Sequence, residues 1–229
     1  MNYEIIIFDA DETLFDFNKS ERAAFKNAML EFNVEYNESY HLGIYQEINT
    51  AIWKEFEEGL ITQEKLKIER FKRLSDTLSA DFDEMEFSKS YIKHLANESF
   101  LYDDSINLIE SLNKDYRLTI VTNGLKEVQN KRIGKSIIAK YFEHIVVSEE
   151  VKLSKPDPKI FELALNNMRY TDKNKVLIVG DSLTTDIQGG INSNIDTCWF
   201  NPNKTTNKTE IKPTYEIYNL MELKDILQK

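Results

Sequence analysis

Short apolar segments alternate with helical ones over much of this chain, and this alternation limits the possible folds more than any other feature. Most of the apolar segments are continuous runs of Ile, Val and Leu, a pattern typical of strands buried on both faces of a parallel sheet. The clearest strand candidates are residues 3–8, 117–122, 145–148 and 175–179, followed by weaker ones at 196–200 and 214–218. The sequence therefore predicts a parallel sheet that is covered on both faces.

Helical periodicity fills the intervals between these segments after about residue 98. The predicted helices are 104–113, 125–140, 158–168 and 184–192. Strands that alternate with helices and are joined by right-handed crossovers form a doubly wound sheet. We therefore predict an α/β fold with a Rossmann-like, doubly wound parallel-sheet core. A polar segment, 201–212, predicts a surface loop.

Residues 16–97 depart from this alternation, because they contain no β-rich run. Their helical stretches lie at 19–32, 38–58, 63–78 and 84–98. This predicts an all-helical insert at 16–97, with an α/β core made of 1–15 and 98–229. Aromatic residues of the insert, such as Tyr45, are expected in its interior, and Arg70 is expected on a solvated helix face.

Charge and cysteine content exclude several classes of protein. The 229 residues include 39 acidic ones against 29 Lys and Arg, for a net charge of −10, which disfavours nucleic-acid polymers and anionic lipid surfaces as partners. Cys198 is the one cysteine, so an intramolecular disulfide and a multi-cysteine zinc site are excluded. The early apolar run 5–8 is too short to span a bilayer, and the first residues lack the pattern of a secretory signal. We expect a cytoplasmic protein without a membrane partner.

Three acids stand directly after the first predicted strand, at Asp9, Asp11 and Glu12. Ligands of open α/β sheets bind at the carboxyl ends of the strands. Asp9 and Asp11 are thus placed to hold a hard cation such as Mg²⁺ through oxygen. The alternative is that they are turn or helix-capping residues.

A second acidic strand end follows residues 175–179. Gly180 permits a close approach of the backbone, Asp181 would stand at the end of the strand, and Asp186 would lie in the first turn of the next helix. Ser182 and Asp186 are also suited to begin that helix, as a cap and as a negative charge near its positive end. Both interpretations can hold together. If the two acidic strands are neighbours, their carboxylates converge and a metal ion would offset the repulsion.

Two further segments carry groups that are suited to phosphate. Thr122, Asn123 and Gly124 offer a hydroxyl and backbone N–H groups at a predicted helix start, although an ordinary helix cap is the alternative. Asp157 can cap the following helix, but this leaves Lys155 unexplained. A rigidly held Lys155 could place its ammonium on a phosphoryl oxygen, and a solvated surface lysine is the alternative.

In chain order these groups form the patterns Asp-x-Asp-x-Thr, Thr-Asn-Gly, Lys-Pro-Asp-Pro and Gly-Asp-x-x-x-x-Asp. This order resembles the haloacid dehalogenase (HAD) superfamily of aspartyl-phosphate hydrolases, and the resemblance covers the whole chain. Residues 16–97 resemble its inserted helical cap. Glu12, where the superfamily often has Gly, and the stretch 147–151 resemble the bacterial pyrimidine 5′-nucleotidase branch.

The resemblance implies a role for each motif residue. Asp9 would be the nucleophile that forms an aspartyl-phosphate, and Asp11 the general acid and then the base for water. The expected Mg²⁺ ligands are oxygen groups of four acids: Asp9, Asp11 through its backbone carbonyl, Asp181, and Asp186 in support. The groups expected to hold the phosphoryl oxygens are Thr122, Asn123, Gly124 and Lys155.

The implied reaction is Mg²⁺-dependent hydrolysis of a small phosphomonoester, chiefly a nucleoside 5′-monophosphate with a pyrimidine or non-standard base. Asp11 favours phosphoryl transfer over dehalogenation, because a halide leaves without a general acid and the dehalogenases of the family lack this second Asp. One alternative is a phosphatase for small sugar or organic phosphates such as phosphoglycolate. A phosphate-binding module without turnover is another, but a binder needs no general acid. The oligomeric state is not indicated.

Overall fold

A computed structural model describes residues 3–228. The chain forms two compact units: one combines the residues up to Phe17 with those from Ser99 onward, and the other is Asn18–Glu98. Residues 1, 2 and 229, which belong to the predicted core, lie outside the described part. Among the described residues, no helix has the length and apolar character needed to cross a membrane.

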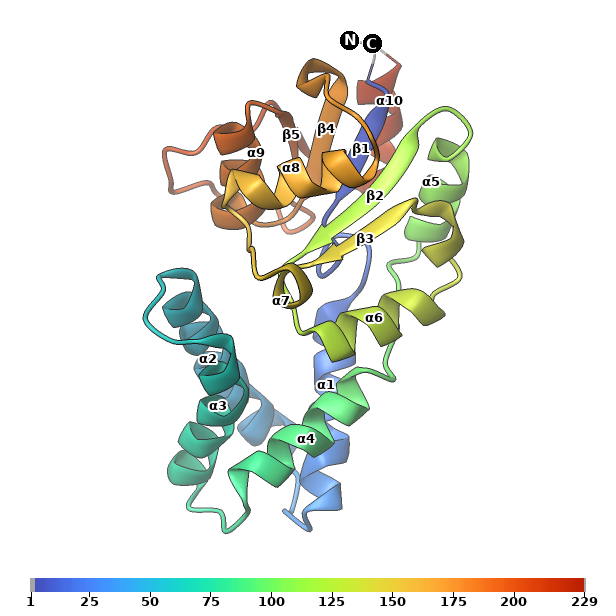
Figure 1. Ribbon diagram of the computed structural model, residues 1–229. Coiled ribbons are helices and arrows are strands. Elements are labelled where there is room, and N and C mark those ends of the chain that lie inside the picture. Colours follow the sequence, from blue (N-terminus) through green and yellow to red (C-terminus); the bar gives the residue numbers. More distant parts are fainter. Residues whose placement is uncertain (1–2, 229) are drawn as a thin grey trace. The chain divides into compact units, whose positions relative to one another are not determined.

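Six parallel strands form one sheet in the order β3-β2-β1-β4-β5-β6 (Figure 1). The strands are β1 Ile5–Phe8, β2 Arg117–Thr122, β3 His144–Val147, β4 Val176–Gly180, β5 Asp196–Phe200 and β6 Tyr215–Ile217. All six lie close to the predicted segments. The α/β prediction with a doubly wound parallel sheet is confirmed.

Helices cover both faces of this sheet (Figure 1). One layer contains α5 Ser105–Leu112, α6 Lys126–Lys135 and α10 Leu223–Leu227, and the other contains α8 Pro158–Asn167 and α9 Gln188–Ser193. Ile6 and Phe8 of β1 pack in the first layer, while Ile5 and Ile7 pack in the second. Successive strand residues face opposite sides of a sheet, so a doubly covered strand has to be continuously apolar.

Two predicted helices differ from those in the structure. The helix predicted at 125–140 ends at Lys135, because Ser136 adopts an extended conformation, and Gly134 and Ser136 are weak helix formers. A short 3₁₀ turn follows at Ala139–Tyr141. The helix predicted at 184–192 begins with the π-helical turn Leu183–Ile187 before α9. The short helix α7, Ser148–Val151, was not predicted.

The second unit is helical. Its elements are α1 Phe17–Glu31, α2 Glu38–Glu57, α3 Gln63–Leu78 and α4 Glu84–Leu95. They lie close to the predicted stretches, with α4 ending three residues early. The side chains of Asn37, Thr62 and Asp83 each accept a backbone N–H at the start of α2, α3 and α4, which satisfies donors that a helix start leaves unpaired.

The interior of the helical unit is aromatic. Tyr45 is fully buried and stacks on Phe25 and Phe71, with ring centroids 4.4 and 5.8 Å apart, so its predicted interior position is confirmed. The prediction of a solvated Arg70 is wrong, because this residue is buried. Its guanidinium lies 4.8 Å from the Phe71 ring centre and 4.9 Å from that of Tyr91. Such cation–π contacts offset part of the hydration that burial removes.

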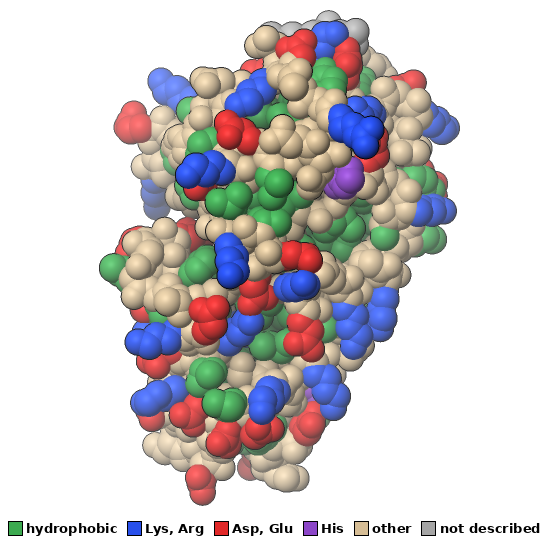
Figure 2. Space-filling view, viewed as in Figure 1, with side chains coloured by type: hydrophobic (Ala, Val, Ile, Leu, Met, Phe, Trp, Pro, Cys, Tyr) green, Lys and Arg blue, Asp and Glu red, His purple; other side chains and the backbone are tan. Residues whose placement is uncertain are grey.

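Charges of both signs are interspersed on the face shown in Figure 2. Ion pairs among the described residues include Arg73 with Glu55 at 2.6 Å and Arg117 with Glu143 at 2.7 Å. On this face the excess of acids therefore does not form a single negative patch.

Candidate active site

The predicted site residues come together because their strands are neighbours. β1 lies between β2 and β4, and all three strands run in the same direction. Their carboxyl ends therefore meet at one edge of the sheet. Asp9 follows β1, Thr122 ends β2 and Asp181 follows β4.

Three carboxylates form a tight cluster at this edge. Oxygen atoms of Asp9, Asp181 and Asp186 lie within 4.8 Å of one another. Burial raises the pKa of Asp9 to about 7, with Lys155 opposing and the charge of Asp186 adding to the rise. Burial likewise raises the pKa of Asp181 well above its ordinary value, and Asp186 adds to this rise. These carboxylate oxygens converge, and their negative charges are unfavourable without a partner. A hard divalent cation prefers such oxygen ligands.

Lys155 lies inside this cluster. Its ammonium donates to a carboxylate oxygen of Asp9 and to Oδ1 of Asp186 at 2.6 Å. Only 3% of the residue is exposed, so the alternative of a solvated surface lysine is wrong. Burial alone would lower the pKa of Lys155, but Asp186 and Asp9 outweigh it and raise that pKa. The ammonium therefore stays charged and neutralises part of the cluster.

Asn123 and Gly124 form hydrogen bonds with residues of the neighbouring segments. The Asn123 amide donates to the Lys155 carbonyl and accepts the Lys155 backbone N–H, both at 2.9 Å. The Gly124 N–H donates to Oγ of Ser148 at 3.1 Å. None of the three residues 122–124 caps α6, which begins after Leu125 without a side-chain cap. The helix-cap interpretation is therefore wrong, while contact of Asn123 and Gly124 with phosphate stays a prediction.

The turn after β4 holds Asp186 against the strand. Ser182 accepts the Thr185 N–H at 3.3 Å and so caps the π-helical turn. The Ser182 N–H in turn donates to Oδ2 of Asp186 at 3.0 Å. A Cβ on Gly180 would lie 2.3 Å from the Asp186 carboxyl carbon, so this close approach requires glycine. The capping role of Ser182 is confirmed.

The Asp11 carboxylate is bonded to side chains of α6 and is not one of the three clustered carboxylates. It accepts from Nη1 of Arg132 at 2.7 Å and from Nε2 of Gln129 at 2.6 Å. The same Gln129 nitrogen donates to Oγ1 of Thr122 at 3.0 Å. Asp11 therefore does not share the carboxylate cluster through its side chain, and a metal contact through its backbone carbonyl stays a prediction.

Gln129 and Arg132 are polar residues that the sequence analysis missed. Both are fully buried, and the Arg132 guanidinium also lies 5.6 Å from the Phe15 ring centre and 5.3 Å from that of Phe17. A signal was present, because these two residues stand three apart on a helix and share its buried face with Val128. A polar pair inside an apolar helix face needs a partner such as the Asp11 carboxylate.

Comparison with known proteins agrees with this geometry. Residues 6–200 match a family model described as haloacid dehalogenase-like hydrolase. The chain belongs to this hydrolase family. The resemblance predicted from the four motifs, and the prediction of an enzyme of this family, are confirmed.

Two curated relatives of this HAD-like hydrolase match it over its whole length. Pyrimidine 5′-nucleotidase PynA of Streptococcus pneumoniae is 35% identical and covered to 97%. Pyrimidine 5′-nucleotidase YjjG of Escherichia coli is 31% identical and fully covered. The crystal structure of the HAD-hydrolase YfnB from Bacillus subtilis, which is bound to magnesium, is 34% identical with a TM-score of 0.94 over all of both chains.

Proposed function

We propose that this protein is a Mg²⁺-dependent phosphatase that hydrolyses nucleoside 5′-monophosphates through a phosphoryl group carried by Asp9. The observation that supports the chemistry is the Asp9 carboxylate, which is buried, bonded to Lys155 and within 4.8 Å of two further carboxylates. The names of the relatives PynA and YjjG support the nucleotide as substrate class.

Asp9, Asp181 and Asp186 would hold Mg²⁺. The bound ion would neutralise their charge and polarise a phosphoryl oxygen, which lets a carboxylate meet a phosphate without prohibitive repulsion.

The residues of the chain divide the remaining work. A carboxylate oxygen of Asp9 attacks phosphorus while the bond to the leaving oxygen breaks, and water then cleaves the resulting acyl phosphate. The Lys155 ammonium donates to the transferring oxygens. Thr122 accepts from Gln129, so its own hydroxyl hydrogen remains to donate to phosphate.

Asp11 would give a proton to the leaving alcohol and later take one from water. Gln129 and Arg132 each bond to one of its two oxygens, so together they define the orientation of the carboxylate. We propose that these two residues position the general acid. Thr122 shares the Gln129 side chain, which links the acid to the phosphate-binding hydroxyl.

The substrate class is tested by comparing kcat/KM for UMP, CMP, phosphoglycolate and glucose 6-phosphate, with Mg²⁺ and with EDTA. We expect the nucleotides to exceed the other esters by about tenfold or more, and EDTA to abolish hydrolysis of all of them. Equal values across the panel would contradict the nucleotide assignment. Undiminished turnover in EDTA would contradict the proposed requirement for a metal ion.

The role of Asp11 predicts a dependence on the leaving group. kcat/KM covers the steps up to the departure of that group, so Asp11→Asn should lower kcat/KM for UMP about 10²–10⁴-fold. For acetyl phosphate, which expels acetate without needing a proton, the kcat/KM of the same variant should fall less than about tenfold. Arg132→Met should likewise lower kcat/KM for UMP more than for acetyl phosphate, with a loss of about tenfold on UMP.

Acetyl phosphate also reports whether each of these variants is folded. Lys131→Met, at an exposed position on the same helix, serves as the matched control and should resemble the wild type. Equal losses on both substrates in Asp11→Asn would refute the general acid. If Asp11→Asn loses more on UMP than on acetyl phosphate but Arg132→Met does not, only the positioning role of Arg132 is refuted.

A further inference from the structure

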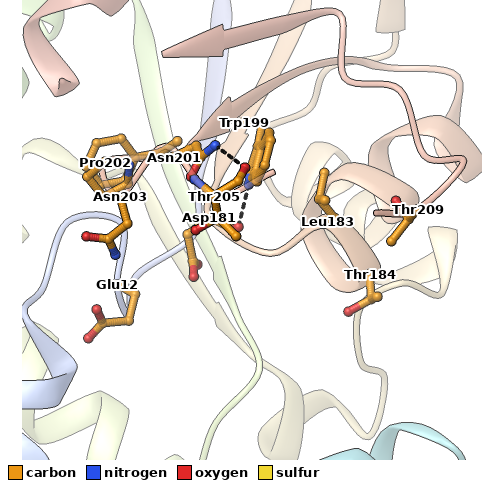
Figure 3. A pocket seen from close by; sticks show the side chains of 11 residues that line it. Glu12, Asp181, Leu183, Thr184, Trp199, Asn201, Pro202, Asn203, Thr205 and Thr209 are labelled. Carbon is orange, nitrogen blue, oxygen red and sulfur yellow. Dashed lines mark hydrogen bonds between the residues drawn. The ribbon is translucent and has the colours of Figure 1, made fainter. Parts of the chain in front are cut away.

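We propose that a cavity beside Asp181 is the subsite for the leaving group and that its lining selects an uncharged nucleoside over an anionic group. This inference rests on the proposed phosphatase activity. The cavity has a volume of about 370 Å³, which lies in the range of small-molecule sites. Its walls come from the end of β5 and from the segments that follow β1, β4 and β5 (Figure 3).

The cavity adjoins the carboxylate cluster through Asp181. This residue lines the cavity, and its carboxylate lies within 4.8 Å of the ligand oxygens of Asp9 and Asp186. A phosphoryl group at Asp9 therefore places the rest of its ester within reach of the cavity. Glu12, only three residues after Asp9, lines the same space (Figure 3).

The wall after β5 is already formed in the structure. The Trp199 indole donates to the Asp181 carbonyl at 2.7 Å. The Asn201 amide donates to the Thr205 carbonyl and accepts the Thr205 N–H, both at 2.9 Å. The segment 201–212 was predicted as a surface loop, and these bonds give its first turn a defined shape. A preformed wall avoids the entropy cost of ordering a loop around a ligand.

The charge of the lining discriminates among leaving groups. None of the eleven lining residues is Lys, Arg or His, while Glu12 and Asp181 are acidic. Lys204 belongs to the same loop but does not line the cavity, and its ammonium lies 5.2 Å from the Tyr218 ring centre. With Asp181 neutralised by the bound ion, the carboxylate of glycolate would still meet the like charge of Glu12 here. An uncharged nucleoside avoids this repulsion.

Asn203 is the lining residue best suited to read a base. Its side chain is exposed and lies at the rim with Glu12 and Pro202 (Figure 3). A carboxamide offers both donor and acceptor groups, which complement the paired donor and acceptor positions on the edge of a pyrimidine. The amide carries no charge. A lysine or arginine at this position would attract an anionic leaving group, whereas the amide favours an uncharged nucleoside.

A charge added at Asn203 tests the inference. The kcat/KM values for UMP and phosphoglycolate are measured in Asn203→Lys and in Thr206→Lys, which adds the same charge to the same loop outside the lining. We expect the phosphoglycolate-to-UMP ratio to rise at least about tenfold in Asn203→Lys and less than about threefold in Thr206→Lys. Equal changes in the two variants would overturn the subsite.

A second variant, Asn203→Ala, adds neither charge nor bulk. Its kcat/KM for UMP, divided by its own value for acetyl phosphate, should fall about tenfold, because the base loses its hydrogen-bond partner. An unchanged quotient would overturn the role of Asn203. Failure of the wild type to hydrolyse acetyl phosphate with Mg²⁺ would instead refute the proposed phosphatase, so the two failures are distinguishable.

Discussion

The Asp9→Asn variant is expected to lose at least about 10⁴-fold in kcat on UMP, because a neutral amide cannot replace the carboxylate as nucleophile. Its folded state should not suffer. Burial raises the pKa of Asp9 to about 7, which means that the folded protein disfavours the charged form relative to the unfolded chain. The near-isosteric amide removes that charge while Lys155 keeps the Asp186 carboxylate as its partner, so in EDTA the free energy of unfolding should stay equal or rise.

Two measurements separate chemistry from folding in this variant. Intact mass after acid quenching should detect a phosphorylated wild-type protein and no phosphorylated Asp9→Asn protein, and urea unfolding should give the stability. Asp103→Asn, which neutralises an exposed acid of the same unit, should leave both unchanged. Substantial turnover by Asp9→Asn would sink the assignment of the nucleophile.

Lys155→Met is expected to combine a loss of activity with a loss of stability. The ammonium bonds to both Asp9 and Asp186 in the interior, and its removal leaves two buried carboxylates without their cation. Breaking a buried pair on one side lowers the free energy of unfolding by about 3 kcal/mol or more. Losing a donor to the transferring phosphate should lower kcat/KM by about 10²–10³-fold.

Mg²⁺ distinguishes this explanation from simple loss of packing. A divalent cation bound by the carboxylates should restore part of the lost stability of Lys155→Met, so urea unfolding is compared in EDTA and in Mg²⁺. Lys159→Met, at an exposed position on α8, should stay within about 0.5 kcal/mol of the wild type. A Lys155→Met protein as stable as the wild type in EDTA would contradict the proposed charge balance.

The sheet and the acidic edge were predictable because they depend on local pattern. A continuously apolar strand such as Ile5–Phe8 is explained only by cover on both faces. Once parallel strands are inferred, the residues after them must share one edge of the sheet. The positions of Asp9 and Asp181 follow from that rule without knowledge of any contact.

The helix after Thr-Asn-Gly shows where local pattern was insufficient. Its periodicity continues past Lys135, but the extended Ser136 ends the helix. Gln129 and Arg132 share the helical spacing of the apolar residue Val128, but polar residues on a helix usually face solvent, so this spacing alone did not reveal their burial. Their function became visible only when the Asp11 carboxylate was found against them.

The sequence by itself determined the α/β class, the helical insert and which acids stand at strand ends, since hydrophobic periodicity is a property of neighbouring residues. Only the tertiary structure decided which charged side chains form ion pairs with each other. Lys155 and Asp9 lie 146 positions apart, and an Asn123 amide on another strand end holds the backbone of that lysine. Ion pairs and hydrogen bonds act over a few ångströms, so they depend on strand order and loop path, which no local pattern encodes.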